Sequence, residues 1–166
     1  MRIDRFAPPG RSVRADLRWL LAIAALTVLI GCTSFYAAFA RGLNEIYEVR
    51  YGIKVLREGF YMPRLAELLR GRFAGVWAFA AGCILLAVLY RGEFTRETKS
   101  IYVMKRLPHA WEYYRRWLPL PALCAVCFFA VCVALAALLS LAYFKNVPAQ
   151  ALPAGQNITI WEAFIL

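Results

Sequence analysis

The stretch Leu118–Phe144, LPLPALCAVCFFAVCVALAALLSLAYF, contains 27 residues and no charged side chain. A helix needs about 20 apolar residues to cross the hydrocarbon core of a bilayer. Two further uncharged runs are long enough, Trp19–Ala40 with 22 residues and Phe73–Tyr90 with 18. The chain is 62% hydrophobic over 166 residues, which is too apolar for a soluble domain of this length. The runs therefore predict an all-α membrane protein with three transmembrane helices, spanning about 19–40, 73–90 and 118–144.

Residues near the ends of these runs predict where the helices begin. Ser12 can cap a helix that begins near Val13, with Asp16 in its first turn. Pro119 suits the first turn of the third span, where its missing N–H has no helical partner to lose. After the third span we expect a tail, 145–166, whose apolar end packs on a partner or on the membrane surface.

Residues 42–70, between the first two spans, have a helical pattern. Apolar and charged residues alternate there at roughly helical spacing, the apolar ones being Leu43, Ile46, Tyr47, Ile53 and Leu56. Gly59 and Pro63 interrupt this pattern before a short Leu-rich segment. We expect an amphipathic helix, a break and a second short helix. The pair would lie at the membrane surface or pack on a neighbouring subunit.

Small residues on the first two spans are candidate helix-packing positions, because they let two helix backbones approach closely. They are Gly31, Ser34, Gly75 and Gly82. The spans also contain five cysteines, including a Cys124-x-x-Cys127 pair. No histidine or acidic residue accompanies this pair, so we expect packing residues rather than redox centres or metal ligands.

The net charge is +10 and is unevenly distributed. Basic residues near span ends favour the cytoplasmic side. With three spans, the basic leader 1–18 and the loop 91–117 lie on one side and contain twelve of the 20 Lys and Arg residues. This predicts a cytoplasmic N-terminus and an extracytoplasmic C-terminus. The charge also suits anionic lipid headgroups, and without a recognised nucleic-acid motif we expect no nucleic-acid partner.

The loop 91–117 is basic, amphipathic and broken by one proline. An apolar stripe over 93–107 includes Phe94, Ile101 and Met104, with basic side chains beside it. Pro108 ends this helix, because its ring disfavours the α conformation of the preceding residue. An aromatic helix follows and leads into the third span. We expect this elbow to lie along the membrane surface and to offer a docking face.

This elbow resembles the intracellular loop of type-2 ABC-transporter permeases, on Glu97-Thr98-Lys99-Ser100, Ile101-Tyr102-Val103-Met104 and Leu107-Pro108. In that family the loop is a coupling helix that docks in a groove of a separate ATPase subunit. The family has six spans as a rule, and Lys99 stands where it has glycine. The resemblance implies a set of partner-binding residues: Glu93, Arg96, Glu97, Thr98, Ser100, Met104, Arg106, Leu107, Pro108 and His109.

The resemblance implies a membrane subunit of a multi-chain transporter that exports an apolar or amphiphilic cargo across a bacterial inner membrane. ATP and Mg would bind to the partner ATPase, because this chain has no G-x-x-x-x-G-K-[ST] loop. Other membrane subunits, or a second copy of the chain, would complete the path. We expect no catalytic residue, metal ligand or cofactor in the chain itself.

A non-transporting scaffold or accessory subunit that stabilises a larger membrane complex is the alternative function. No charged residue lies inside the three apolar runs, and charged residues inside spans commonly mark ion or proton pathways. An ion pump or a proton-coupled carrier is therefore disfavoured. A membrane enzyme is disfavoured too, because the sequence has no nucleophile–base pair or metal-binding cluster.

Overall fold

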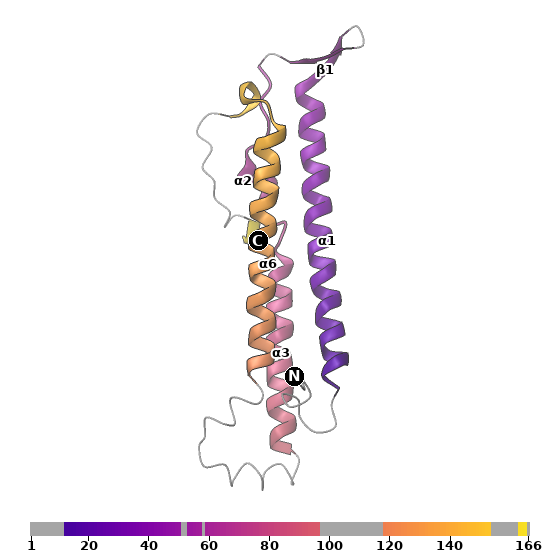
Figure 1. Ribbon diagram of the computed structural model, residues 1–166, viewed down its shortest axis with the longest axis vertical. Helices are drawn as coiled ribbons and strands as arrows, with labels where there is room; N and C mark the ends of the chain where they lie inside the picture. Colours follow the sequence, from indigo (N-terminus) through magenta and orange to yellow (C-terminus); the bar gives the residue numbers. More distant parts are fainter. Residues whose placement is uncertain (1–11, 51–52, 58, 97–117, 154–162, 166) are drawn as a thin grey trace. The chain divides into compact units, whose positions relative to one another are not determined.

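The computed structural model describes residues 12–50, 53–57, 59–96, 118–153 and 163–165. These residues form the helices α1 (Val13–Ile46), α2 (Leu65–Leu69), α3 (Gly75–Arg96) and α6 (Pro119–Asn146). They also form two short strands, β1 (Tyr47–Arg50) and β2 (Ile53–Leu56), and a 3-10 helix, η2 (Ala149–Ala151) (Figure 1).

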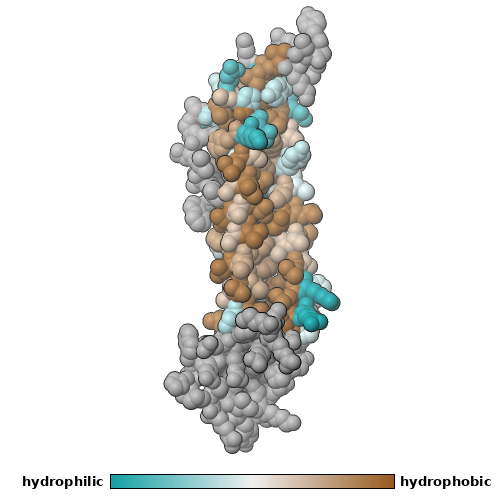
Figure 2. All heavy atoms as spheres, viewed as in Figure 1, coloured by the Kyte–Doolittle hydropathy of each residue, from teal (hydrophilic) through white to brown (hydrophobic). Residues whose placement is uncertain are grey.

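Among the described residues, three helices are long and apolar enough to cross a membrane: α1, α3 and α6. Large apolar side chains on all three are exposed rather than buried, for example Trp19, Trp77 and Leu138. Figure 2 shows the resulting hydrophobic surface over the helices. Such a surface is stable when lipid is its solvent. The predicted all-α membrane fold with three transmembrane helices is confirmed, and the chain is an integral membrane protein.

The helix starts follow the predicted signals. The carbonyl of Ser12 accepts hydrogen bonds from the N–H groups of Ala15 (3.0 Å) and Asp16 (3.4 Å), so α1 begins at Val13 as predicted. The third span begins at Pro119, also as predicted. The first helix has 34 residues, which makes it about 51 Å long at 1.5 Å per residue. It is therefore longer than the hydrocarbon core is thick.

The prediction of an amphipathic helix continuing beyond Ile46 is wrong. At that residue α1 ends and an antiparallel hairpin of β1 and β2 begins, in which Tyr47 pairs with Leu56 and Arg50 with Ile53 (Figure 1). The physical reason is an alternation of period two in YEVR and IKVL, in which Tyr47 and Val49, then Ile53 and Val55, are aromatic or β-branched and are separated by charged residues. A helical spacing of the same apolar residues fits less well.

The chain forms two compact units, which we describe separately. Unit 1 comprises Met1–Ala25 and Val76–Phe129. In its described part, the hydroxyl of Tyr90 donates a hydrogen bond to a carboxylate oxygen of Asp16, at 3.0 Å. The rings of Phe79 and Phe128 pack with their centroids 4.2 Å apart. Unit 1 therefore combines a buried aromatic contact with a polar contact between the first turn of α1 and α3.

Unit 2 comprises Leu26–Gly75 and Ala130–Leu166. Its core is aromatic: Phe35 stacks on Phe39, and Phe39 meets the ring of Tyr143 edge-on at 6.1 Å. The hydroxyl of the fully buried Tyr143 donates a hydrogen bond to the carbonyl of Pro63, at 2.9 Å. This bond ties α6 to the segment that links the hairpin with α3.

Candidate functional site

The segment Met62–Ala74, which we call the re-entrant stretch, lies along α1 and is mostly not α-helical. Near one end, a Cβ placed on Gly42 would lie 2.9 Å from the side chain of Met62. Near the other end, a Cβ placed on Gly31 would lie 2.9 Å from the carbonyl oxygen of Arg72. The stretch thus follows α1 back toward its N-terminus, and only the five residues of α2 interrupt it with helix.

The depth of this stretch follows from its contact with α1. The apolar run Trp19–Ala40 is about 33 Å long as a helix, close to the thickness of the hydrocarbon core. Gly31 lies within about 3 Å of the middle of that run along the helix axis. The carbonyl of Arg72 contacts Gly31 and is therefore level with the middle of the apolar run of α1. Along its own segment, Arg72 stands directly before the uncharged run Phe73–Tyr90 of the second span.

Backbone groups at this depth need partners, because lipid offers none. After α2, the N–H of Arg70 bonds to the carbonyl of Ala66 (2.9 Å), and the N–H of Arg72 to that of Leu69 (3.1 Å). Gly71 lies between them with φ +66°, a left-handed conformation that favours glycine. The Nε of Arg72 donates to the carbonyl of Leu68 at 3.1 Å. The end of α2 is therefore satisfied by its own turn and by an arginine side chain.

The C-terminal residues Ala163–Ile165 complete this arrangement. The carbonyl of Ala163 accepts a hydrogen bond from the N–H of Phe73, at 3.0 Å, just before α3 begins. The rings of Phe73 and Phe164 lie 6.2 Å apart, and both side chains are buried. We expected the apolar tail to pack on a partner or on the membrane surface. Its described residues instead pack on the chain's own re-entrant stretch.

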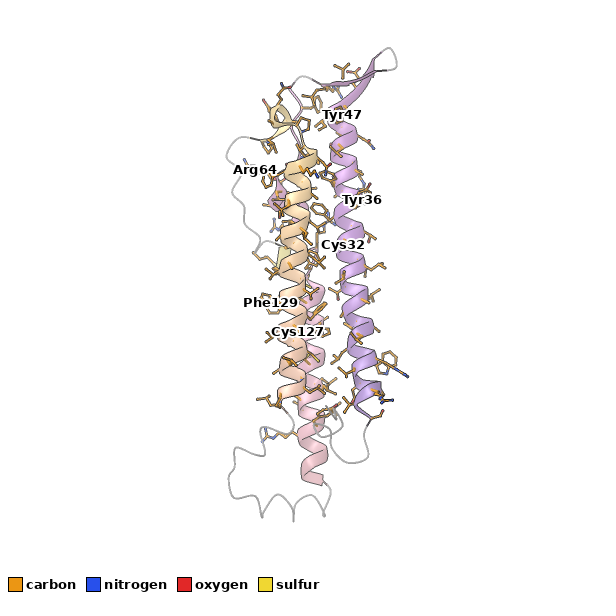
Figure 3. All side chains as sticks on the ribbon, viewed as in Figure 1. Cys32, Tyr36, Tyr47, Arg64, Cys127 and Phe129 are labelled. Carbon is orange, nitrogen blue, oxygen red and sulfur yellow. The ribbon has the colours of Figure 1, made fainter. Side chains whose placement is uncertain are left out.

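Charge distinguishes the re-entrant stretch from the rest of the membrane domain. It contains Arg64, Arg70 and Arg72, against one acidic residue, Glu67. Arg64 and Arg70 are exposed, and Arg72 is half-buried; Arg64 lies next to α2 (Figure 3). Among the described residues, no acidic side chain forms an ion pair with any of the three. Next to an apolar span, such guanidinium groups need water, headgroups or an anion as partners.

The predicted packing residues have different surroundings. Gly31 and Gly75 are at close contacts: a Cβ on Gly75 would lie 2.7 Å from the side chain of Thr27. Gly82 is less constrained, with Leu20 at an ordinary 3.7 Å. The hydroxyl of Ser34 donates to the carbonyl of Gly31, within the same helix, at 3.1 Å.

The predicted coupling residues cannot be placed in the same way. Glu93 and Arg96 belong to the last turns of α3. The others lie outside the described residues: Glu97, Thr98, Ser100, Met104, Arg106, Leu107, Pro108 and His109.

Cysteines occupy both buried and exposed positions on the spans. Cys83 and Cys132 are buried, whereas Cys127 is exposed on α6 (Figure 3), and all five are free thiols. Groups of three or more metal-ligating side chains are absent from the part of the chain that the structure describes. Among the described residues, neither Cys124 nor Cys127 belongs to such a metal-ligating group.

Reasoning from the sequence missed the depth of the re-entrant stretch. A usable signal was present, because Pro63 and Gly71 bracket a Leu-rich segment directly before a short apolar run. Short or Gly/Pro-interrupted hydrophobic segments are a known sign of discontinuous helices at membrane depth.

The chain matches no protein-family model, no curated protein and no solved structure.

Proposed function

We propose that this chain is a membrane-spanning subunit of a multi-chain, ATP-driven transporter, and that the re-entrant stretch forms part of the cargo path. One observation carries the proposal. The backbone between α2 and α3 is interrupted beside Gly31, level with the middle of the apolar run of α1, with Arg70 and Arg72 at the interruption. Discontinuous helices with polar groups at this depth are typical of transporter binding sites, because irregular backbone is tolerated there only inside protein or beside water.

The coupling part of the proposal rests on the sequence resemblance of the loop 91–117. A separate ATPase subunit would bind ATP and Mg, and its docking would involve Glu97 and Arg106. In this arrangement the N-terminus and the loop are cytoplasmic, the C-terminus is outside, and the membrane is a bacterial inner membrane. The basic residues of the leader and the loop support this orientation. Export is the direction that the resemblance favours.

A purification from native membranes tests the proposal. The tagged full-length chain is extracted in mild detergent, and mass spectrometry identifies the proteins that accompany it. We expect an ATPase subunit, and we expect it to be lost in the double charge reversal Glu97→Lys with Arg106→Glu. The matched control is Arg41→Glu with Glu45→Lys, which reverses the same charges on exposed positions of α1 and should retain the ATPase.

A scaffold or accessory subunit is the second candidate. It is favoured by the broad exposed apolar faces of α6, where Leu123, Val126, Leu138 and Leu141 have no covering segment among the described residues. Such faces suit other membrane proteins as well as lipid. If the same purification recovers membrane proteins without any ATPase, the transporter proposal fails and the scaffold function is preferred.

A further inference from the structure

We propose that the re-entrant stretch thins the bilayer on one side of the chain, because water and headgroups enter the leaflet that is nearer to the hairpin. This goes beyond the proposed function, since the membrane would be deformed whether or not the chain transports anything. The proposal is carried by a difference in height between the apolar ends of two neighbouring segments of unit 2.

The two segments place the edge of the hydrocarbon at different heights. On α1, the uncharged run continues to Ala40 before Arg41 follows. On the re-entrant stretch, Arg72 directly precedes the uncharged run of the second span, and its carbonyl is level with Gly31. Gly31 lies nine residues before Ala40, which is about 14 Å along a helix axis. One leaflet therefore meets two edges that differ in height by up to about 14 Å.

The charged side chains between these two heights face outward. The three leucines of α2 are buried, whereas Glu67 on α2 and Arg70 at its end are exposed. Long arginine side chains reach toward the headgroups, but the shorter side chain of Glu67 reaches less far. The stretch is also held in place, because its two ends contact α1 and α6. Water and headgroups must therefore come to the charged face of α2.

The face of α6 is apolar at the same height. The ring of Tyr143 meets Phe39 edge-on at 6.1 Å, and its hydroxyl bonds to the carbonyl of Pro63. These contacts place the start of the re-entrant stretch level with Tyr143. Leu138 and Leu141, within about one and a half turns of Tyr143, are 60% and 65% exposed. Hydrocarbon suits these leucines, whereas water suits the charged face of α2.

A bilayer resolves this conflict by changing its local thickness. Next to a short hydrophobic surface it becomes thinner, at a modest cost per ångström. Leaving exposed charges in hydrocarbon costs more. The leaflet therefore dips next to α2 and keeps its full depth next to α6.

Cysteine labelling of the full-length chain in nanodiscs of dioleoyl phosphatidylcholine tests the proposal. Glu67→Cys places a thiol on the exposed face of α2, and Leu138→Cys places one at a similar height on the exposed face of α6. A charged, water-soluble maleimide reacts with thiolates, which hydrocarbon disfavours. We expect reaction at Glu67→Cys to be at least about tenfold faster than at Leu138→Cys. The unaltered chain gives the background from its five native cysteines.

A second readout shows whether headgroups accompany the water. A bimane fluorophore on each introduced cysteine is exposed to nitroxides carried either on the lipid headgroup or at the end of an acyl chain. We expect the headgroup nitroxide to quench more strongly at Glu67→Cys, and the acyl-chain nitroxide to quench more strongly at Leu138→Cys. Fast maleimide reaction without headgroup quenching would identify a water-filled cavity between copies of the chain, and the proposal would fail.

Removal of charge tests the cause of the dip. In the Glu67→Cys background, Arg64→Leu with Arg70→Leu should shift bimane quenching toward the acyl-chain nitroxide, because the stretch then tolerates hydrocarbon. Quenching is the readout here, since nearby arginines also favour the thiolate that maleimide needs. The matched control, Arg41→Leu with Arg57→Leu, removes two exposed arginines elsewhere in unit 2 and should leave the quenching unchanged.

Equal reaction rates at the two introduced cysteines would overturn the proposal. Fast reaction at both would mean that the hydrocarbon ends at one height around the whole of unit 2. Slow reaction at both would mean that lipid chains or a second copy cover α2. If Glu67→Cys does not fold, Arg70→Cys, at the exposed end of α2, should give the same contrast with Leu138→Cys.

Discussion

The two halves of α1 contact two different kinds of segment, one a continuous helix and the other mostly not helical. In unit 1, the N-terminal half contacts a continuous helix, α3, and a Cβ on Gly82 would lie at an ordinary 3.7 Å from Leu20. In unit 2, the other half contacts the re-entrant stretch, and a Cβ on Gly31 or Gly42 would lie at 2.9 Å from its neighbour. At Gly31 the neighbour is a backbone carbonyl, that of Arg72, which cannot move aside as a side chain can. At Gly42 the neighbour is the side chain of Met62. Glycine is therefore needed most at position 31.

The largest effect should come from filling the close contact. We expect Gly31→Ala to destabilise the protein by about 1–3 kcal/mol, because the new methyl group would overlap the carbonyl of Arg72 and the ring of Phe73. Gly82→Ala is the matched change in unit 1, where space is available, and should be neutral or stabilising by up to about 1 kcal/mol. Thermal unfolding in detergent measures both. Equal effects of the two changes would remove the distinction between the halves of α1.

A double-mutant cycle tests whether the close contact at the start of α3, between Gly75 and Thr27, also requires glycine. Gly75→Ala alone should destabilise, because its Cβ would lie 2.7 Å from the side chain of Thr27. Thr27→Ala removes that obstacle, so the double variant should be more stable than the sum of the single effects predicts, by about 0.5–2 kcal/mol. The readout is again thermal unfolding. Strict additivity would show that the two side chains do not compete for the same space.

Two tyrosine hydroxyls allow a smaller, paired test. Tyr143→Phe should cost about 0.5–1.5 kcal/mol, because the carbonyl of Pro63 loses its donor inside unit 2. Trypsin should then cut faster after Arg64 in protein reconstituted in a bilayer. Tyr90→Phe removes the bond to Asp16 in unit 1 and should leave the cleavage rate at Arg64 unchanged. Faster cutting in both variants would mean that the re-entrant stretch is not held locally.

The smallest effect is expected in the hairpin. Val55 is exposed on β2, and Val55→Thr keeps the branched shape that suits a strand. Its effect on unfolding should stay within about 0.5 kcal/mol. This change belongs to unit 2 but not to the re-entrant stretch. A large loss of stability would show that the sensitivity of unit 2 extends beyond the contacts with α1.

The sequence was sufficient for the features that depend on local chemistry. Uncharged runs indicated the three spans, because crossing a bilayer requires length and low polarity and little else. Ser12 and Pro119 indicated helix starts, because capping and proline geometry act within one turn. The hairpin is also locally encoded in YEVRYGIKVL, but the same apolar residues fit a helical spacing, which predicts a helix where the structure has β1 and β2.

Features that depend on distant residues could not be predicted. Ile158–Leu166 looks like a loose apolar end in the sequence, yet Ala163 and Phe164 pack on Phe73. Likewise, Arg70 and Arg72 look like ordinary loop residues near a span. Their position beside α1 depends on how far the re-entrant stretch follows that helix, with close contacts at Gly31 and Gly42.

The hydrogen bond between Phe73 and Ala163 also imposes an order on biosynthesis. The N–H of Phe73 enters the bilayer when the second span is inserted, but its acceptor is synthesised about 90 residues later, which takes on the order of 5–20 seconds on a ribosome. During that interval the N–H of Phe73 lacks its final acceptor, and the hydrocarbon core of the bilayer supplies none. A translocon, a lipid headgroup or water must meet that N–H first, and the last residues of the chain then displace it.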